Sequence, residues 1–109
     1  MKDLDSIMYE GRALIKGGNP DDAVACFTRA AELDPTNATV WNDLGVALFI
    51  SNQSQPAIEA FQNAIHYDAS FPDAYINLAT LASRAGDSTL LQSIVDAAKM
   101  RGITLEEER

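Results

Sequence analysis

The sequence predicts an all-α protein, an α-solenoid built from three antiparallel helix-turn-helix repeats. The chain matches itself when it is shifted by 34 residues, the interval from Gly11 to Gly45. Apolar residues recur at the three-and-four spacing of a helix face, and glycine, asparagine and proline separate these stretches. We therefore expect one domain over residues 1–109, with repeats at about 4–37, 38–71 and 72–102 and a short C-terminal tail at 103–109.

The 34-residue shift aligns residues of similar size in the three units. It places Gly11 on Gly45 and on Ala79, so each unit has a small residue at the same position. Small residues allow two helices to approach closely, and large neighbours fill the remaining space. The other aligned sets are Ile7, Trp41 and Tyr75; Ala23, Ala57 and Leu91; Phe27, Phe61 and Val95; and Ala30, Ala64 and Ala98.

Each unit reads as a helix, a turn and a second helix. In the middle unit, Trp41, Leu44 and Leu48 share one face of the first expected helix. Glycine and asparagine in the intervening segments tolerate the left-handed conformation that ends a helix, and proline suits the start of the next one. We expect six main helices with Trp41 and Phe61 buried. The turns are expected near Gly18, Asn52 and Gly86.

This arrangement of residues resembles the tetratricopeptide repeat family. The middle unit, residues 38–71, carries W-x-x-L-G from Trp41 and A-x-x-x-F-x-x-A from Ala57, although Ala69 stands where the first unit has Pro35. The first unit lacks the tryptophan, and the third is the weakest match. The resemblance covers nearly the whole chain. It implies a right-handed superhelix whose inner wall, built by the first helix of each repeat, is a peptide-binding groove.

The charge balance disfavours two classes of partner. The chain has 16 acidic and 8 basic residues and a formal net charge of −8, which repels phosphate backbones and anionic lipid surfaces. We therefore expect neither a nucleic acid nor a membrane partner. No apolar run has the length of a signal peptide or a membrane span, and the single cysteine, Cys26, suits a reducing compartment. We expect a cytoplasmic protein.

No group of residues indicates an enzyme, a cofactor or a metal site. One histidine and one cysteine are too few for a structural zinc site. His66 is expected to be a surface or helix-end residue, and Cys26 a small packing residue. The pair Asp21 and Asp22 falls at an expected helix start, where carboxylates complement the helix dipole. The leading interpretation is a protein–protein interaction module, or adaptor.

The expected groove follows from the helical repeat, because steps of 100° per residue separate the core face from the inner face. The expected groove has more apolar side chains than a solvated helix face requires. We therefore expect its ligand to be an apolar or amphipathic segment of a partner protein or peptide. The alternative is that Phe49 and Ile50 only pack between helices. The expected groove residues are Met8, Arg12, Ile15, Asn42, Val46, Phe49, Ile50, Ile76, Thr80 and Arg84.

A known subgroup of the family grips the C-terminal carboxylate of chaperones with lysines, asparagines and an arginine on this wall. The matching places here hold Met8, Arg12, Asp43, Asp73 and Asn77. Two acidic residues and a methionine would oppose a carboxylate rather than bind it. We therefore expect that chaperone tails are not ligands.

The last helix supports the alternative of a structural protein that assembles with copies of itself. An apolar stripe of Leu90, Ile94 and Ala97 replaces largely polar residues of the earlier repeats. Either the tail folds back and lays Ile103 and Leu105 over the stripe, or a second molecule covers it to form a homodimer, or another partner uses it. Residues expected to face a following repeat are polar in this unit, so no fourth repeat is expected to stack. These are Gln92, Lys99 and Arg101.

Overall fold

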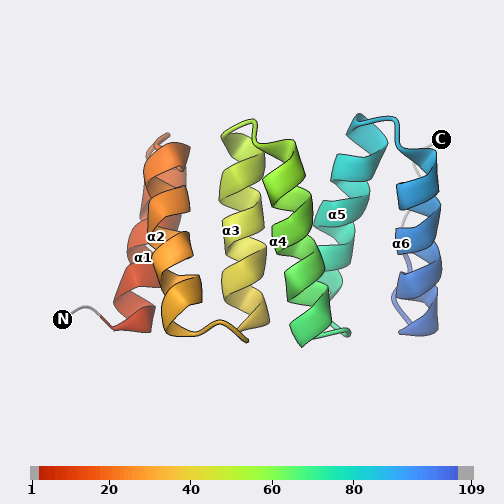
Figure 1. The fold of residues 1–109 in the computed structure, drawn as a ribbon, viewed down its shortest axis with the longest axis horizontal. Coiled ribbons are helices and arrows are strands. Elements are labelled where there is room, and N and C mark those ends of the chain that lie inside the picture. The colour runs from red at the N-terminus through yellow and green to blue at the C-terminus, as the bar shows by residue number, and fades with distance from the viewer. Residues whose placement is uncertain (1–2, 106–109) are drawn as a thin grey trace.

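The computed structural model describes residues 3–105, and these form six α-helices without a β-strand (Figure 1). Successive helices run antiparallel and pack as three hairpins in a row, so the all-α solenoid expected from the sequence is confirmed. The helices are α1 (Leu4–Lys16), α2 (Pro20–Leu33), α3 (Ala38–Ile50), α4 (Ser54–Tyr67), α5 (Pro72–Arg84) and α6 (Ser88–Met100).

Several helix ends follow from capping and turn residues in the sequence. The Asn37 side chain accepts hydrogen bonds from the first backbone N–H groups of α3, and Asp87 does the same for α6. The turns inside the hairpins contain one residue each with positive φ, the conformation that glycine and asparagine tolerate best. These residues are Gly18 (81°), Asn52 (63°) and Gly86 (69°), as the sequence predicted.

Equivalent hydrogen bonds hold the joints between the hairpins. The indole N–H of Trp41 donates to the carbonyl oxygen of Pro35 at 2.7 Å. The hydroxyl of Tyr75 donates to the carbonyl oxygen of Ala69 at 2.8 Å. Tyr75 is buried, but Trp41 is only half-buried, so the expectation of a buried tryptophan was wrong. The large indole reaches the loop with its N–H edge and leaves part of the ring in solvent.

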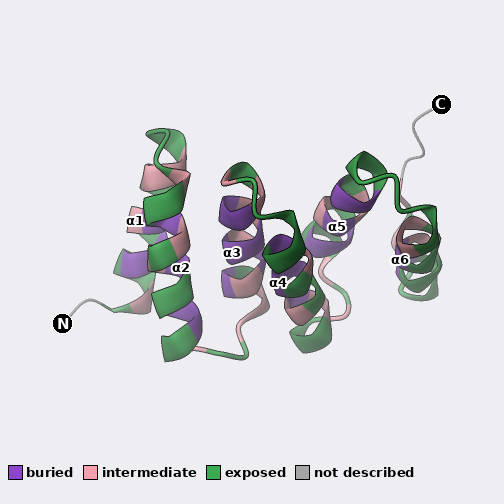
Figure 2. Ribbon diagram, turned by 45° about the horizontal axis from the view of Figure 1, so that its top comes forward, coloured by how far each residue is buried: buried purple, intermediate pink, exposed green. Residues whose placement is uncertain are grey.

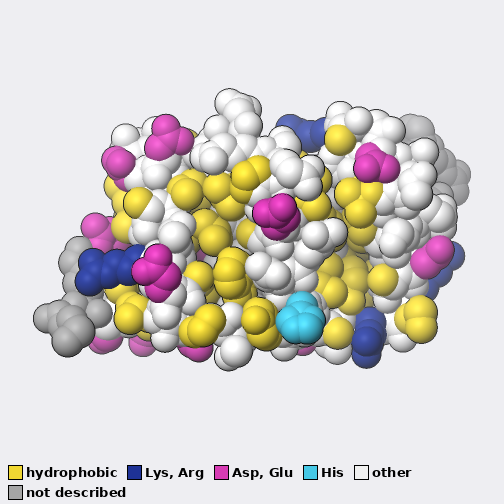
Figure 3. Space-filling view, in the orientation of Figure 1, with side chains coloured by type: hydrophobic (Ala, Val, Ile, Leu, Met, Phe, Trp, Pro, Cys, Tyr) yellow, Lys and Arg dark blue, Asp and Glu magenta, His cyan; other side chains and the backbone are white. Residues whose placement is uncertain are grey.

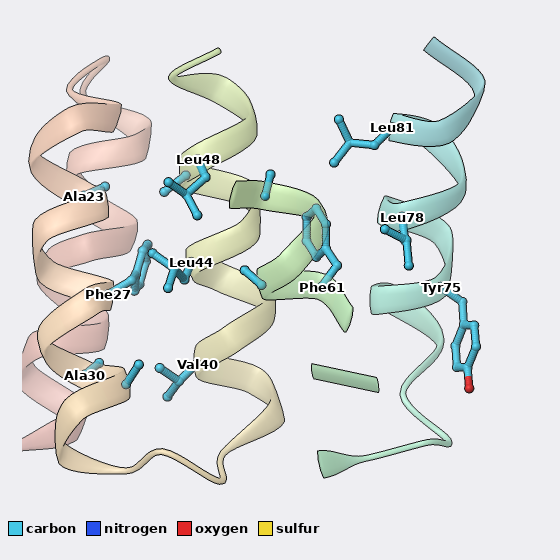
Figure 4. Close-up of a cluster of buried hydrophobic side chains, with 14 of the residues drawn as sticks. Ala23, Phe27, Ala30, Val40, Leu44, Leu48, Phe61, Tyr75, Leu78 and Leu81 are labelled. Carbon is cyan, nitrogen blue, oxygen red and sulfur yellow. The ribbon is translucent and has the colours of Figure 1, made fainter. Parts of the chain in front are cut away.

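The core depends on close approach between the two helices of each hairpin. Phe61 of α4 is 1% exposed, and a Cβ atom added at Gly45 of α3 would lie 2.5 Å from its ring. The first hairpin repeats this arrangement with Gly11 and Phe27. Between hairpins, Leu44 of α3 points toward α2, and the equivalent leucine of α5 points toward α4 (Figure 4). Most of the buried apolar residues belong to one core cluster, and every helix contributes buried positions (Figure 2).

The six helices form two layers of different curvature. In the layer of α1, α3 and α5, neighbouring helices contact each other; in the layer of α2, α4 and α6 they do not, as far as residues 3–105 are concerned. The array therefore curves toward the first layer, which we call the inner wall. No helix in the described part of the chain is both long and apolar enough to cross a bilayer.

The described part of the tail, residues 103–105, returns along α6 (Figure 1). Gly102, with φ of 74°, reverses the chain, and the Ile103 N–H donates to the Ala98 carbonyl oxygen at 2.9 Å. Ile103 and Leu105 are half-buried against the core. Residues 106–109 of the expected tail lie outside the described range.

Candidate functional site

The inner wall is cross-linked by two polar contacts between neighbouring helices. The guanidinium of Arg12 on α1 donates from Nε and Nη2 to Oδ2 of Asp43 on α3, at 2.9 and 2.7 Å. One repeat further, Nδ2 of Asn77 on α5 donates to Oδ1 of Asn42 on α3 at 3.0 Å. Asp43 and Asn77 occupy the same position in their repeats. The same position of successive inner helices therefore reaches back to the helix before it.

Asp43 sets the electrostatics of the middle of the wall. Its side chain is 19% exposed, whereas the side chain of Arg12 is 56% exposed. Burial raises the pKa of Asp43 above its ordinary value of 3.8; Arg12 opposes this shift, and the nearby charge of Asp73 adds to it. Two carboxylates near one guanidinium leave this level of the wall acidic, and the expected cation Arg12 already has a partner within the chain.

The apolar side chains that were expected to line the wall are at least partly exposed. Ile50 is 46% exposed and Ile76 is 50% exposed, while Val46 and Phe49 are half-buried. The guanidinium carbon of Arg84 lies 5.1 Å from the centre of the Phe49 ring, which is a cation–π distance. This contact holds Arg84 at the edge of the apolar surface.

The remaining expected groove residues differ in how much surface they offer. Met8 and Asn42 are each 7% exposed, so they support the wall from inside more than they line it. Ile15 is half-buried. Thr80 is exposed, and its hydroxyl donates to the carbonyl oxygen of Ile76 at 2.9 Å.

Two hollows flank the wall at opposite ends of the array. The larger, which we call the C-terminal groove, has a volume of about 790 Å³ and lies between α5, α6 and the tail. It is lined by Ile76, Ala79, Thr80, Ser83, Arg84, Leu91, Gln92, Val95, Thr104 and Leu105. The smaller measures about 460 Å³ and lies between α1 and the start of α3. It is lined by Leu4, Asp5, Met8, Tyr9, Arg12, Asn37, Thr39 and Val40.

The contribution of α6 and the tail to the C-terminal groove was not expected from the sequence. The groove had been placed on the first helix of each repeat alone, whereas Leu91, Val95 and Leu105 come from outside that layer. A signal was present in the sequence, because Val95 stands where the earlier repeats have a larger phenylalanine. A smaller side chain at that position leaves space beside α5.

Comparisons with known proteins agree with the repeat architecture. Residues 11–50 match the family model described as TPR repeat. The chain is similar to tetratricopeptide repeat (TPR) proteins. It is 36% identical over 66 residues to the peroxisomal targeting signal receptors of Candida glabrata and Saccharomyces cerevisiae, a match that covers 61% of this chain and 11% of each relative. It is also 28% identical over 88 residues to the TPR repeat-containing thioredoxin TTL4 of Arabidopsis thaliana, covering 81% of this chain and 13% of the relative. The chain thus spans only about a tenth of the length of these relatives.

Solved structures share the fold. The crystal structure of MamA superposes with a TM-score of 0.82 at 25% identity, covering 91% of this chain and 58% of the other. The second TPR of Spaghetti (RPAP3), solved with the HSP90 peptide SRMEEVD, has a TM-score of 0.80 at 21% identity, covering 89% and 90%. The TPR2B domain of yeast Sti1, solved in a complex with pHsp70, has a TM-score of 0.83 at 23% identity, covering 90% and 78%.

The apolar stripe of α6 is less exposed than its sequence suggested. Ile94 is 5% exposed and belongs to the core, Leu90 is half-buried, and Ala97 is exposed. Leu105 of the tail lines the C-terminal groove with Leu91, and Ile103 packs against the core that contains Ile94. Self-association through this stripe would therefore have little apolar surface to bury.

The lone histidine and cysteine lie apart from the wall. His66, near the end of α4, is exposed and contacts Tyr67 with ring centres 4.9 Å apart. Cys26 on α2 is half-buried. Among residues 3–105, no group of three or more His, Cys, Asp or Glu side chains is placed to hold a metal ion. The chemistry that the inner wall offers is apolar contact, hydrogen bonding and ion pairing.

Proposed function

We propose that this chain is a protein–protein interaction module that binds an apolar or amphipathic segment of a partner protein on the inner wall. The observation that carries the proposal is the exposure of Ile50 and Ile76, at 46% and 50%, on two helices of the inner layer. Each square ångström of apolar surface that a partner covers contributes about 25 cal/mol, so these side chains favour an apolar ligand.

The neighbouring side chains support an amphipathic ligand. Val46 and Phe49 extend the apolar surface between the two isoleucines, and their half-buried positions hold them in place. Arg84 stacks over Phe49 and presents a fixed positive charge at the edge of this surface. A ligand with an apolar face and one carboxylate near Arg84 would satisfy both features.

The relatives support a binding role without identifying the partner. Two of them are named as receptors of a peroxisomal targeting signal, and two related TPR folds were solved in complexes with chaperones or chaperone peptides. Chaperone carboxylate tails are not the ligands we propose here, because Asp43 and Asp73 put negative charge in the middle of the wall. We assign no catalytic residue, and the lone Cys26 suits a reducing compartment such as the cytoplasm.

A peptide selection followed by affinity measurements tests the proposal. Random peptides displayed on phage would be selected on the immobilised chain, and the best binder measured by fluorescence polarisation. The double variant Phe49→Ala, Ile50→Ser should weaken binding by about tenfold or more. The matched control Leu33→Ser changes an exposed apolar residue of α2, outside the inner wall, and should leave affinity unchanged.

The salt dependence separates an apolar from an electrostatic mode. Affinity should change by less than about threefold between low and physiological salt, since burial of apolar surface is not screened. A collapse of about tenfold or more over that range, together with a silent double variant, would contradict the proposed mode. Failure to select any peptide that distinguishes the double variant from Leu33→Ser would contradict the binding role of the wall.

A further inference from the structure

We propose that copies of this chain associate head to tail, with α1 of one copy lying in the C-terminal groove of the next. The proposal rests on the two ends of the array, and the C-terminal groove shares Ile76 with the surface on which a peptide is proposed to bind. The occupant of the groove is therefore a second copy of this chain.

The fold itself shows what fits such a groove. Each inner helix after α1 lies against the pair that precedes it: α3 contacts α1 and α2, and α5 contacts α3 and α4. The C-terminal groove, between α5 and α6, is the corresponding place one repeat further along. Within residues 3–105 no helix occupies it, and only Thr104 and Leu105 of the tail lie at its side. Within the chain, the equivalent places hold inner helices. An inner helix from another copy is therefore the element that fits this groove.

The polar contacts of the wall define which residues would meet. Asp43 and Asn77, at equivalent positions of α3 and α5, reach back to Arg12 and Asn42. The equivalent residue of α1 is Tyr9, and no helix precedes α1 within residues 3–105. Continuing the pattern by one repeat places Tyr9 of the next copy beside the residues of α5 equivalent to Arg12 and Asn42. These are Thr80 and Ile76.

The exposure of these residues fits that contact. Tyr9 is 78% exposed and Ile76 is 50% exposed, and they lie at opposite ends of the array. Pairing them would remove both large apolar surfaces from water. The tyrosine hydroxyl would remain at the rim, near the exposed Thr80, where a polar group is satisfied by hydrogen bonding.

The polarity of the two ends is also complementary. Leu44 of α3 and Leu78 of α5 point toward the preceding hairpin, and the aligned residue of α1 is the acid Glu10. Ile65 of α4 aligns with Lys99 of α6, so this position is basic in the last repeat. Glu10 on one end face and Lys99 on the other therefore carry opposite charges. Opposite charges on two faces favour their encounter and fix their orientation. Lys99, which disfavours an apolar fourth repeat, is thus matched by Glu10 of α1.

Sedimentation equilibrium of the 109-residue chain tests the proposal. A head-to-tail contact joins two different surfaces of the chain, so variants that each lose one surface can be mixed to restore a single contact. The average mass of the wild type should rise above the monomer mass of 11.8 kDa between about 10 µM and about 1 mM. Tyr9→Arg and Ile76→Arg should each remain monomeric alone. Their equimolar mixture should form a 1:1 dimer that grows no further, because only one competent pair of ends remains.

Controls separate this outcome from loss of fold or of peptide binding. Both substituted side chains are exposed, so circular dichroism of the variants should match the wild type. Leu33→Arg, an equally exposed site on α2, should assemble as the wild type does, and Tyr9→Arg should bind the selected peptide normally. A wild type that keeps its monomer mass at the highest concentration would overturn the proposal. So would folded variants that assemble singly, or whose mixture stays monomeric.

Discussion

Replacing Gly45 by alanine should destabilise the protein, although alanine favours helices by about 1 kcal/mol over glycine. The new Cβ atom would lie 2.5, 2.7 and 2.8 Å from three atoms of the Phe61 ring, closer than side chains tolerate. Phe61 is 1% exposed, so the ring has no solvent to move into. Overpacking of this kind costs about 1–3 kcal/mol. With three ring atoms too close, we expect the upper end of that range and a net loss of about 2 kcal/mol.

Urea unfolding followed by circular dichroism measures this change, and a double-mutant cycle assigns its cause. The third repeat has Ala79 and Val95 at these two positions, so Phe61→Val should make room for the alanine. Alone, Phe61→Val should lower the free energy of unfolding by roughly 2–4 kcal/mol through the cavity it leaves. The double variant should be more stable than additivity predicts by at least about 1 kcal/mol. Gly11→Ala, against Phe27, is the matched repeat of the test. A Gly45→Ala protein as stable as the wild type, or strictly additive substitutions, would refute the packing argument.

Two further predictions concern the core and the wall. Leu44→Asp should prevent folding, because Leu44 is 7% exposed and points at α2. An unpaired buried charge costs several kcal/mol, whereas the whole free energy of unfolding of a domain is about 5–15 kcal/mol. Leu33→Asp, at an exposed site, is the control, and a cooperative thermal melt of Leu44→Asp like that of the wild type would contradict this. Asp43→Asn should remove a pH dependence of stability. The folded protein holds the Asp43 proton more tightly than the unfolded chain does, because the pKa of Asp43 is raised on folding. The free energy of unfolding of the wild type should therefore fall relative to that of the variant as the pH rises from 3.8 through the raised pKa. Urea titrations of both proteins across that range check the sign, and a relative gain of the wild type with pH would contradict it.

The local features of the fold could be predicted because they depend on residues close in sequence. Gly18, Asn52 and Gly86 recur 34 residues apart, and each adopts the positive φ that its turn requires. Phe61 is buried as expected, since the facing glycine leaves space only for its ring. Trp41 was misplaced because an indole at a joint must also satisfy its N–H group, and the nearest acceptor is a loop carbonyl at the surface.

The candidate site was harder to predict because it depends on how neighbouring repeats are placed relative to each other. Helical spacing put Arg12 on the inner wall, but its ion pair with Asp43 requires the register of α1 against α3. The burial of Ile94 likewise follows from packing in the last hairpin, which its apolar neighbours in the sequence do not reveal. Surfaces shared by two repeats therefore need the three-dimensional arrangement.

The hydrogen bond from the indole of Trp41 to the carbonyl oxygen of Pro35 gives the chain a built-in optical probe. The sequence has a single tryptophan, so its emission reports on the joint between the first and second hairpins and on no other. The equivalent bond at the next joint is made by Tyr75, whose emission is distinct. In an array held together by contacts between neighbours, ends can open before the middle. Tryptophan emission therefore follows one joint, while circular dichroism averages over all six helices.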